Sequence, residues 1–151
     1  MVRRHPVRAV LIVVLTALIG VGVWLWARPP ELPTSASPRT VARTFFELSA
    51  ARRSLAARHF VWRPGRLGAP GGDAYGGVTL LTVDKGRAIR HHGGLPSEYL
   101  ALADLWELEV TYRTSHDDAI GNPPGEYVRF VMLGRENASS PWRLVGVGTG
   151  P

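Results

Sequence analysis

A run of nineteen residues without a charged side chain, from Ala9 to Ala27, constrains this chain more than any other feature. As an α-helix, a segment of this length extends across nearly all of the ~30 Å hydrocarbon core of a bilayer. Trp24 and Trp26 lie at its C-terminal end, and tryptophans concentrate where a membrane meets water. The run therefore predicts a transmembrane helix over residues 9–27.

The basic side chains around this run predict which way it crosses the membrane. Arg3, Arg4 and Arg8 precede it, whereas Arg28 alone follows directly. Because short segments rich in Lys and Arg stay in the cytoplasm, residues 1–8 are expected to form a cytoplasmic tail and the rest of the chain to be extracytoplasmic. A cleaved signal peptide is the alternative, but its apolar region is shorter, about 7–15 residues. An uncleaved signal-anchor in the cell membrane is favoured.

The chain after the apolar run divides into a spacer and one domain. Residues 28–38 read RPPELPTSASP, and this abundance of Pro and Ser predicts an extended linker that cannot nucleate a core. Residues 39–151 have the length of one domain. The absence of cysteine excludes disulfide bonds, thiolate metal ligands, a cysteine nucleophile and a lipid anchor on cysteine.

The net charge of +6 does not indicate a nucleic-acid-binding protein. Four of the 18 basic side chains flank the apolar run, and the other 14 are matched by 12 acidic ones in the rest of the chain. Duplex-binding domains usually carry a clustered basic face. The one dense basic group here is interpreted as a solvated helix face or a contact with anionic lipid. Its members are Arg39, Arg43, Arg52, Arg53 and Arg58.

Two helical stretches are predicted at the start of the domain. Ser37 followed by Pro38 is a helix start signal. The buried stripe of the first stretch recurs at i, i+4 and i+7, at Val41, Phe45 and Leu48. The second stretch runs through Leu55, Ala56, His59 and Phe60. The pattern leaves open whether a break near Arg52 separates the two, and the Gly- and Pro-rich residues 63–77 are predicted to form a loop.

The period of the apolar pattern then changes from 3.6 to 2, which predicts strands. Residues 105–113 alternate most clearly, with one face formed by Trp106, Leu108, Val110 and Tyr112. Further strands are predicted over residues 78–83, 127–133 and 142–147, with connections over 114–125 and 134–141. Residues 95–104 fit either a short helix or an early start of the next strand. Helices followed by an antiparallel meander predict an α+β fold with the helices packed on one face of the sheet.

Three segments together resemble a known superfamily: the helical VARTFFELSAARRSLAARHF, the strand LEVTYR from Leu108, and the closing PWRLVGVGTGP. They resemble the nuclear-transport-factor-2-like (SnoaL-like, cystatin-like) domains, and within them a bacterial extracytoplasmic family of unknown function known mostly from lipoproteins. The resemblance covers residues 38–151 and implies a strongly curved sheet wrapped against the helices as a cone, with a pocket at its wide end. The chain departs from the lipoprotein members in having no cysteine for a lipid anchor. The family implies no catalytic residues.

Histidines form the first two polar groups that could carry chemistry. His91 and His92 are adjacent and point to opposite sides of a strand, so they could not easily bind one metal together. His116 has Asp117 and Asp118 beside it, and such a pair could act as a general base. The surrounding Gly and Pro residues favour ordinary turn chemistry instead.

Carboxylates form the third polar group. If the Trp106 face is the core, Glu107 and Glu109 face solvent, where Arg129 or Arg143 on a neighbouring strand could pair with them. Asp104 precedes this strand. No catalytic, cofactor-binding or metal-ligating residue is assigned from any of these groups, and no cofactor is expected.

Aromatic side chains are the most informative candidates for a binding site. They are too numerous for a featureless small core. Most are expected to pack between the sheet and the helices, and a subset could line a pocket mouth: Trp106, Tyr112, Tyr127 and Trp142. The leading hypothesis is a non-catalytic, membrane-anchored extracytoplasmic domain that binds an envelope protein or an apolar small ligand. One alternative is an assembly component of a secretion or conjugation apparatus. A second is a small hydrolase or isomerase that uses the cone pocket.

Overall fold

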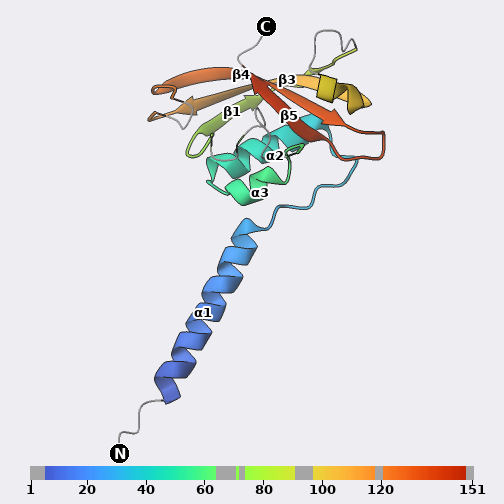
Figure 1. The fold of residues 1–151 in the computed structure, drawn as a ribbon. Coiled ribbons are helices and arrows are strands. Elements are labelled where there is room, and N and C mark those ends of the chain that lie inside the picture. Colours follow the sequence, from blue (N-terminus) through green and yellow to red (C-terminus); the bar gives the residue numbers. More distant parts are fainter. Residues whose placement is uncertain (1–5, 64–70, 72–73, 91–96, 118–120, 149–151) are drawn as a thin grey trace, which may run out of the picture.

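The N-terminal helix stands apart from the rest of the chain (Figure 1). The computed structural model describes residues 6–63, 71, 74–90, 97–117 and 121–148. The first helix, α1, covers Pro6–Ala27, and none of its residues from Val10 to Ala27 is buried. By length and composition it is the one helix in the described part of the chain that could cross a membrane, in agreement with the predicted apolar span.

Helix α2, Pro38–Ala50, begins where the sequence predicts. The Ser37 side chain accepts a hydrogen bond from the Thr40 amide at 3.1 Å, which satisfies one of the free N–H groups at the start of the helix. Pro38 occupies the first turn, where its missing N–H has no cost. The predicted stripe is confirmed, because all its members are buried: Val41, Phe45 and Leu48.

A break separates α2 from the short helix α3, Ser54–Arg58. Arg52 has a positive φ of 57°, a left-handed conformation that ends the first helix. This turn changes which side of the following helix faces the core. Only half of the residues predicted to be buried in the second stretch are therefore buried. Ala56 and Phe60 are buried, whereas Leu55 is 62% exposed and His59 is also exposed.

The remaining elements form one antiparallel sheet in the order β1-β3-β4-β5, with β2 also paired to β3. The strands are β1 Thr79–Val83, β2 Arg87–Ala88, β3 Asp104–Thr114, β4 Gly125–Arg135 and β5 Arg143–Gly148. A 3-10 helix, η1 Ser97–Ala101, precedes β3. Residues 97–104 therefore contain both of the predicted alternatives, a short helix and then the start of the strand. The α+β class with an antiparallel sheet is confirmed.

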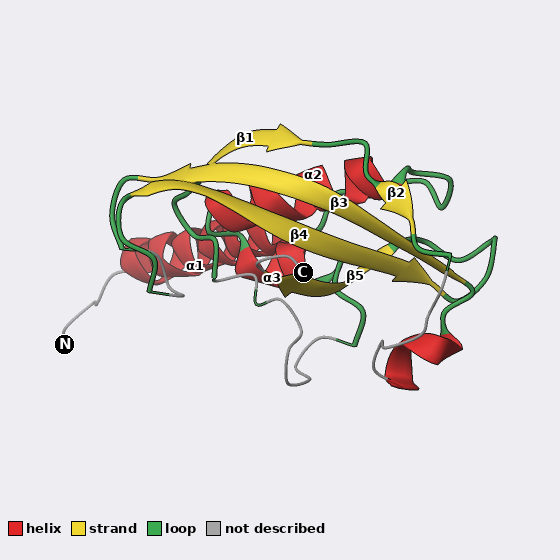
Figure 2. Cartoon of the chain, turned by 90° about the horizontal axis from the view of Figure 1, so that it is seen from above, coloured by secondary structure: helices red, strands yellow, loops and turns green. Residues whose placement is uncertain are grey.

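The main core lies between the sheet and the helices, which cover one face (Figure 2). The alternating face predicted for β3 is the core face: Leu108, Val110 and Tyr112 are at most 1% exposed. Phe45 and Phe46 of α2 pack there with ring centroids 5.3 Å apart. A smaller cluster of Leu102, Leu105 and Val145 lies on the opposite face of the sheet.

Glycine is required at the turn between β1 and β2. Gly86 has a φ of +70°, and a Cβ there would lie 2.3 Å from the main-chain oxygen of Glu107. The close approach lets the indole of Trp106 donate a hydrogen bond to the oxygen of Lys85 at 3.0 Å. This turn holds β2 against β3 and fixes the position of Trp106 at the end of the core.

Candidate functional site

Arg53 joins the domain to the end of α1. It lies in the connection between α2 and α3, and its Nε donates to the Trp26 oxygen at 2.8 Å while its Nη2 donates to the Arg28 oxygen at 2.9 Å. The last carbonyls of a helix have no partners within the helix, and the helix dipole makes this end negative. A guanidinium group therefore suits the position by both hydrogen bonding and charge. Contact between α1 and α3 accompanies these bonds.

The linker lies along the base of the domain after leaving α1. Leu32 and Ala36 pack against the main core, and Arg28 pairs with Glu31 at 2.7 Å. We call residues 28–36 the strap, because the segment crosses the domain face nearest α1 before α2 begins. The composition of a Pro-rich segment makes it extended but does not determine its path, and here packing against the core determines that path.

Between the strap and the domain lies a hollow of about 440 Å³. We call it the juxtamembrane hollow because it lies beside the end of α1, the helix that could cross a membrane. The strap supplies three prolines and Leu32 on one side. Val41, Phe60 and Trp142 supply apolar surface on the domain side. The full lining is Arg28, Pro29, Pro30, Glu31, Leu32, Pro33, Thr34, Ala36, Val41, His59, Phe60, Pro141, Trp142 and Arg143.

Backbone pairing brings the two polar residues of this hollow together. The chain after α3 runs beside β5, with the Trp62 amide donating to the Leu144 oxygen at 2.7 Å and the Leu144 amide to the Phe60 oxygen at 2.8 Å. This register places His59 next to Arg143, whose Nη1 donates to the His59 main-chain oxygen at 2.5 Å. The guanidinium group is thereby held at the wall of the hollow.

The electrostatics of the juxtamembrane hollow favour an anion. His59 remains exposed on one side, and its partial burial lowers its pKa below the usual 6.5; the positive charge of Arg143 lowers it further. Burial also lowers the pKa of Arg143, although a guanidinium stays protonated at neutral pH. The hollow at neutral pH therefore combines apolar walls, a neutral imidazole and the cation of Arg143, while the charges of Arg28 and Glu31 offset each other.

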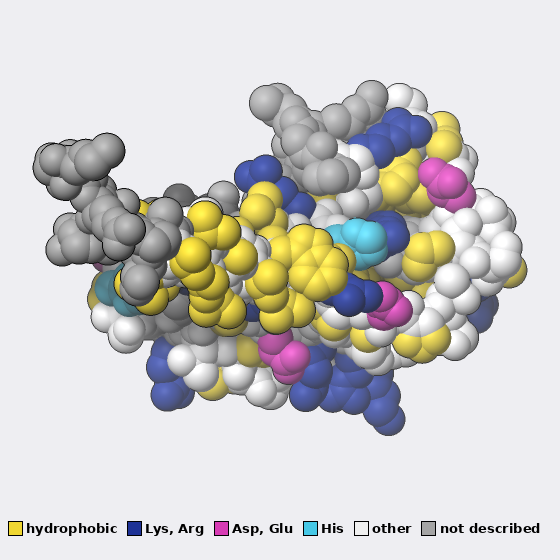
Figure 3. Space-filling view, turned by 90° about the horizontal axis from the view of Figure 1, so that it is seen from below, with side chains coloured by type: hydrophobic (Ala, Val, Ile, Leu, Met, Phe, Trp, Pro, Cys, Tyr) yellow, Lys and Arg dark blue, Asp and Glu magenta, His cyan; other side chains and the backbone are white. Residues whose placement is uncertain are grey.

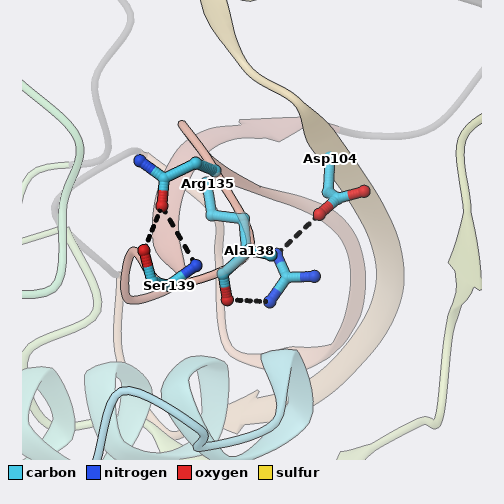
Figure 4. Close-up of polar contacts among 5 residues, drawn as sticks. Asp104, Arg135, Ala138 and Ser139 are labelled. Atoms are coloured by element: carbon cyan, nitrogen blue, oxygen red, sulfur yellow. Dashed lines mark hydrogen bonds and ion pairs between the residues drawn. The ribbon is translucent and has the colours of Figure 1, made fainter.

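A second hollow, of about 360 Å³, lies at the start of β3. Trp106 and Trp142 both line it, with ring centroids 6.4 Å apart. The Cζ atom of Arg135 lies 4.8 Å from the ring centroid of Trp142. The same guanidinium pairs with Asp104 at 2.6 Å and donates to the Ala138 oxygen at 3.1 Å (Figure 4). Arg90 also lines this hollow. Its Arg135 is already paired with a carboxylate, that of Asp104, which makes this guanidinium less available to an anionic ligand.

The four aromatic residues predicted for a pocket mouth do not come together. Tyr112 is fully buried and its ring lies 5.8 Å from that of Tyr127, in the half of the sheet nearest the β3–β4 turn. The two tryptophans form a separate pair, and Trp142 lines both hollows. The space between α2 and the sheet is filled by Phe45, Phe46 and Tyr112, so the described hollows lie outside it.

The polar candidates are dispersed. Asp104 begins β3 and His116 follows its end, so a strand of 11 residues, on the order of 35 Å long, separates them. Thr114 Oγ1 donates to the His116 oxygen, the local turn bonding expected there. His91, His92 and Asp118 lie outside the described residues. Within the described ranges no three His, Asp or Glu side chains group to hold a metal ion.

A cross-strand arginine pairs with Glu107, as expected, but it is neither of the two predicted ones. Glu107 pairs with Arg87 of β2 at 2.8 Å. Arg129 lies opposite Val110 and so projects from the other face of the sheet, where its Nη2 donates to Asn122 Oδ1 at 3.1 Å. The alternation of side chains along β3 decides this outcome, because opposite residues share a face.

Comparison of the chain with protein-family models, curated proteins and solved structures found no match.

The pKa of His59 tests the electrostatics of the hollow. An NMR titration, assigned with His59→Gln, is expected to give a value below 6.5. Arg143→Gln should raise it only partly, because burial is the larger cause. Between pH 6.5 and the lower pKa of the folded state, the unfolded chain binds more protons at His59 than the folded chain does. The free energy of unfolding therefore falls as the pH decreases through this window, and His59 has no effect on it above the window. Titration of the native chain at 6.5 would contradict this account.

Proposed function

We propose that this chain is a single-pass membrane protein whose extracytoplasmic domain binds an acidic amphiphile, a molecule with an apolar body and an anionic group. The juxtamembrane hollow carries the proposal, because it lies beside the end of α1 and combines apolar walls with the guanidinium of Arg143. Its volume of about 440 Å³ falls within the usual range for small-molecule sites. A ligand in this position is reached directly from the bilayer surface.

The membrane topology rests on the sequence and on the exposure of α1. An apolar helix with no buried residue from Val10 to Ala27 lacks protein to cover it, and lipid is the environment that suits it. The excess of arginines before the apolar run favours a cytoplasmic N-terminus. Under this proposal the strap, the hollow and the sheet lie outside the cell membrane.

We also propose that residues 38–151 form a nuclear-transport-factor-2-like domain with a curved sheet. Helices that precede the strands and cover one face of an antiparallel sheet support this assignment. Aromatic side chains fill the space where a cone pocket would lie, which favours binding at the base of the domain over binding inside a cone. The same filling, with the dispersal of Asp104 and His116, argues against the hydrolase or isomerase alternative.

One observation favours the assembly alternative. On the sheet face away from α2, a hollow of about 250 Å³ is lined by Phe130 and Met132, and Val128 is 42% exposed nearby on β4. A second copy of this chain is the occupant this alternative requires. Sedimentation of the full chain in detergent would then show an oligomer, and a strict monomer would remove this alternative.

Cysteine labelling tests the topology, because the chain has no cysteine of its own. Ala138→Cys in an exposed turn should react with a membrane-impermeant maleimide in intact cells. Val2→Cys should react only after the cells are made permeable, which makes it the matched control. Labelling of position 2 alone in intact cells would reverse the orientation, and a released chain that begins beyond Trp26 would replace the anchor with a signal peptide.

Binding of the fluorescent fatty acid cis-parinarate by the full chain in detergent tests the ligand class. A hydrogen bond to a charged group contributes about 1.5–3 kcal/mol, so Arg143→Gln should weaken binding on the order of tenfold to a hundredfold. Arg135→Gln is the matched control, since Arg135 lines only the second hollow.

Native mass spectrometry of the full chain extracted from its own membranes should show a bound acidic amphiphile that is lost in Arg143→Gln. Equal affinity for cis-parinarate in both arginine variants and the native chain would contradict the proposed site. Loss of binding in Arg135→Gln alone would move the site to the second hollow.

A further inference from the structure

Helix α3 lies where the domain comes closest to the membrane helix. It contacts α1, and Arg53, immediately before α3, bonds the carbonyls of Trp26 and Arg28. Figure 1 shows α3 on the side of the domain from which α1 leaves. If α1 ends at the level of the outer lipid headgroups, the start of α3 lies about one arginine side chain away from those headgroups.

The exposed side of α3 carries a large apolar side chain. Leu55 is 62% exposed, although its neighbours Ala56 and Ala57 are fully buried. A leucine in this position gains nothing from the protein core. Leu100, on η1, is 61% exposed, but η1 belongs to the part of the chain that packs on the opposite face of the sheet. The described part of the domain thus offers two leucines of nearly equal exposure, one beside α1 and one away from it.

Positive charge accompanies Leu55. Residues 51–58 read ARRSLAAR, with three arginines and no acidic residue. Arg58 lies three residues after Leu55, which places both on the same side of the helix. Figure 3 shows Lys and Arg side chains on the face of the domain from which α1 projects. Basic residues at a membrane surface are attracted to anionic lipids.

We propose that α3 rests on the outer surface of the bilayer, with Leu55 at the boundary of headgroups and acyl chains and Arg58 against the phosphates of anionic lipids. The inference rests on the proposal that α1 crosses the membrane. A lipid contact by α3 adds to the anchoring by α1, because it sets the depth and tilt of the domain relative to the bilayer. It also directs the mouth of the juxtamembrane hollow toward lipid.

Spin-label accessibility in nanodiscs tests this contact on the full chain. Labels are placed singly by Leu55→Cys, Leu100→Cys and Leu15→Cys, in phosphatidylcholine alone and with added phosphatidylglycerol. The label at 55 is expected to be protected from a water-soluble nickel reagent and accessible to oxygen, most strongly with phosphatidylglycerol. The label at 100 should remain exposed to nickel in both lipids. Adding Arg58→Gln should lower the ratio of buried to exposed label at 55 about fivefold, the effect of one basic residue near an anionic surface.

The label at 15 separates failure of this inference from failure of the anchor. If position 15 is protected while 55 is as exposed to nickel as 100, α1 crosses the bilayer and the lipid contact of α3 is wrong. Protection at 55 that is equal in the two lipid mixtures would overturn the assignment to anionic headgroups. Exposure at 15 would overturn the membrane anchor, and this inference with it.

Discussion

The two hydrogen bonds from Arg53 to the end of α1 are the interaction on which the arrangement of this molecule depends. An apolar helix with no buried residue from Val10 to Ala27 offers little packing that could orient a domain, so the orientation depends on its end. Arg53 supplies donors where the helix leaves free carbonyls and a negative dipole. With each bond worth about 1 kcal/mol net, the pair favours the docked arrangement by a factor on the order of thirty.

This docking explains why the Pro-rich linker encloses a hollow. Once α1 is held beside α3, the strap must cross the base of the domain to reach Ser37, and Leu32 and Ala36 pack on the core along that path. The hollow between them faces His59 and Arg143, which backbone pairing of the α3 end with β5 holds together. Helix α1, the strap and the proposed binding site are therefore parts of one structural unit, and the proposed ligand class follows from the position of the hollow as much as from its lining.

Local patterns predict the parts of this molecule that local physics determines. The apolar span, the Ser37 cap, the stripe at Phe45 and the alternation of β3 each depend on residues within a few positions of one another, and each is confirmed. The Arg53 contacts join residues that are 25 and 27 positions apart in the sequence, and the contact between Arg143 and His59 joins residues 84 positions apart. No local sequence pattern predicts contacts over such separations. The break at Arg52 depends on one backbone conformation, which also shifted Leu55 out of the predicted buried stripe.

The distance between α1 and the domain tests the central claim most directly. Since the chain lacks cysteine, Val23→Cys and Ala138→Cys supply the only two spin-label sites, both on exposed residues. Double electron–electron resonance on the full chain in nanodiscs is predicted to give one narrow distance distribution that broadens when Arg53→Ala is added and stays narrow with Arg43→Ala. A distribution that is already broad in the native background, or one that Arg53→Ala leaves unchanged, would contradict the docking of the domain through Arg53.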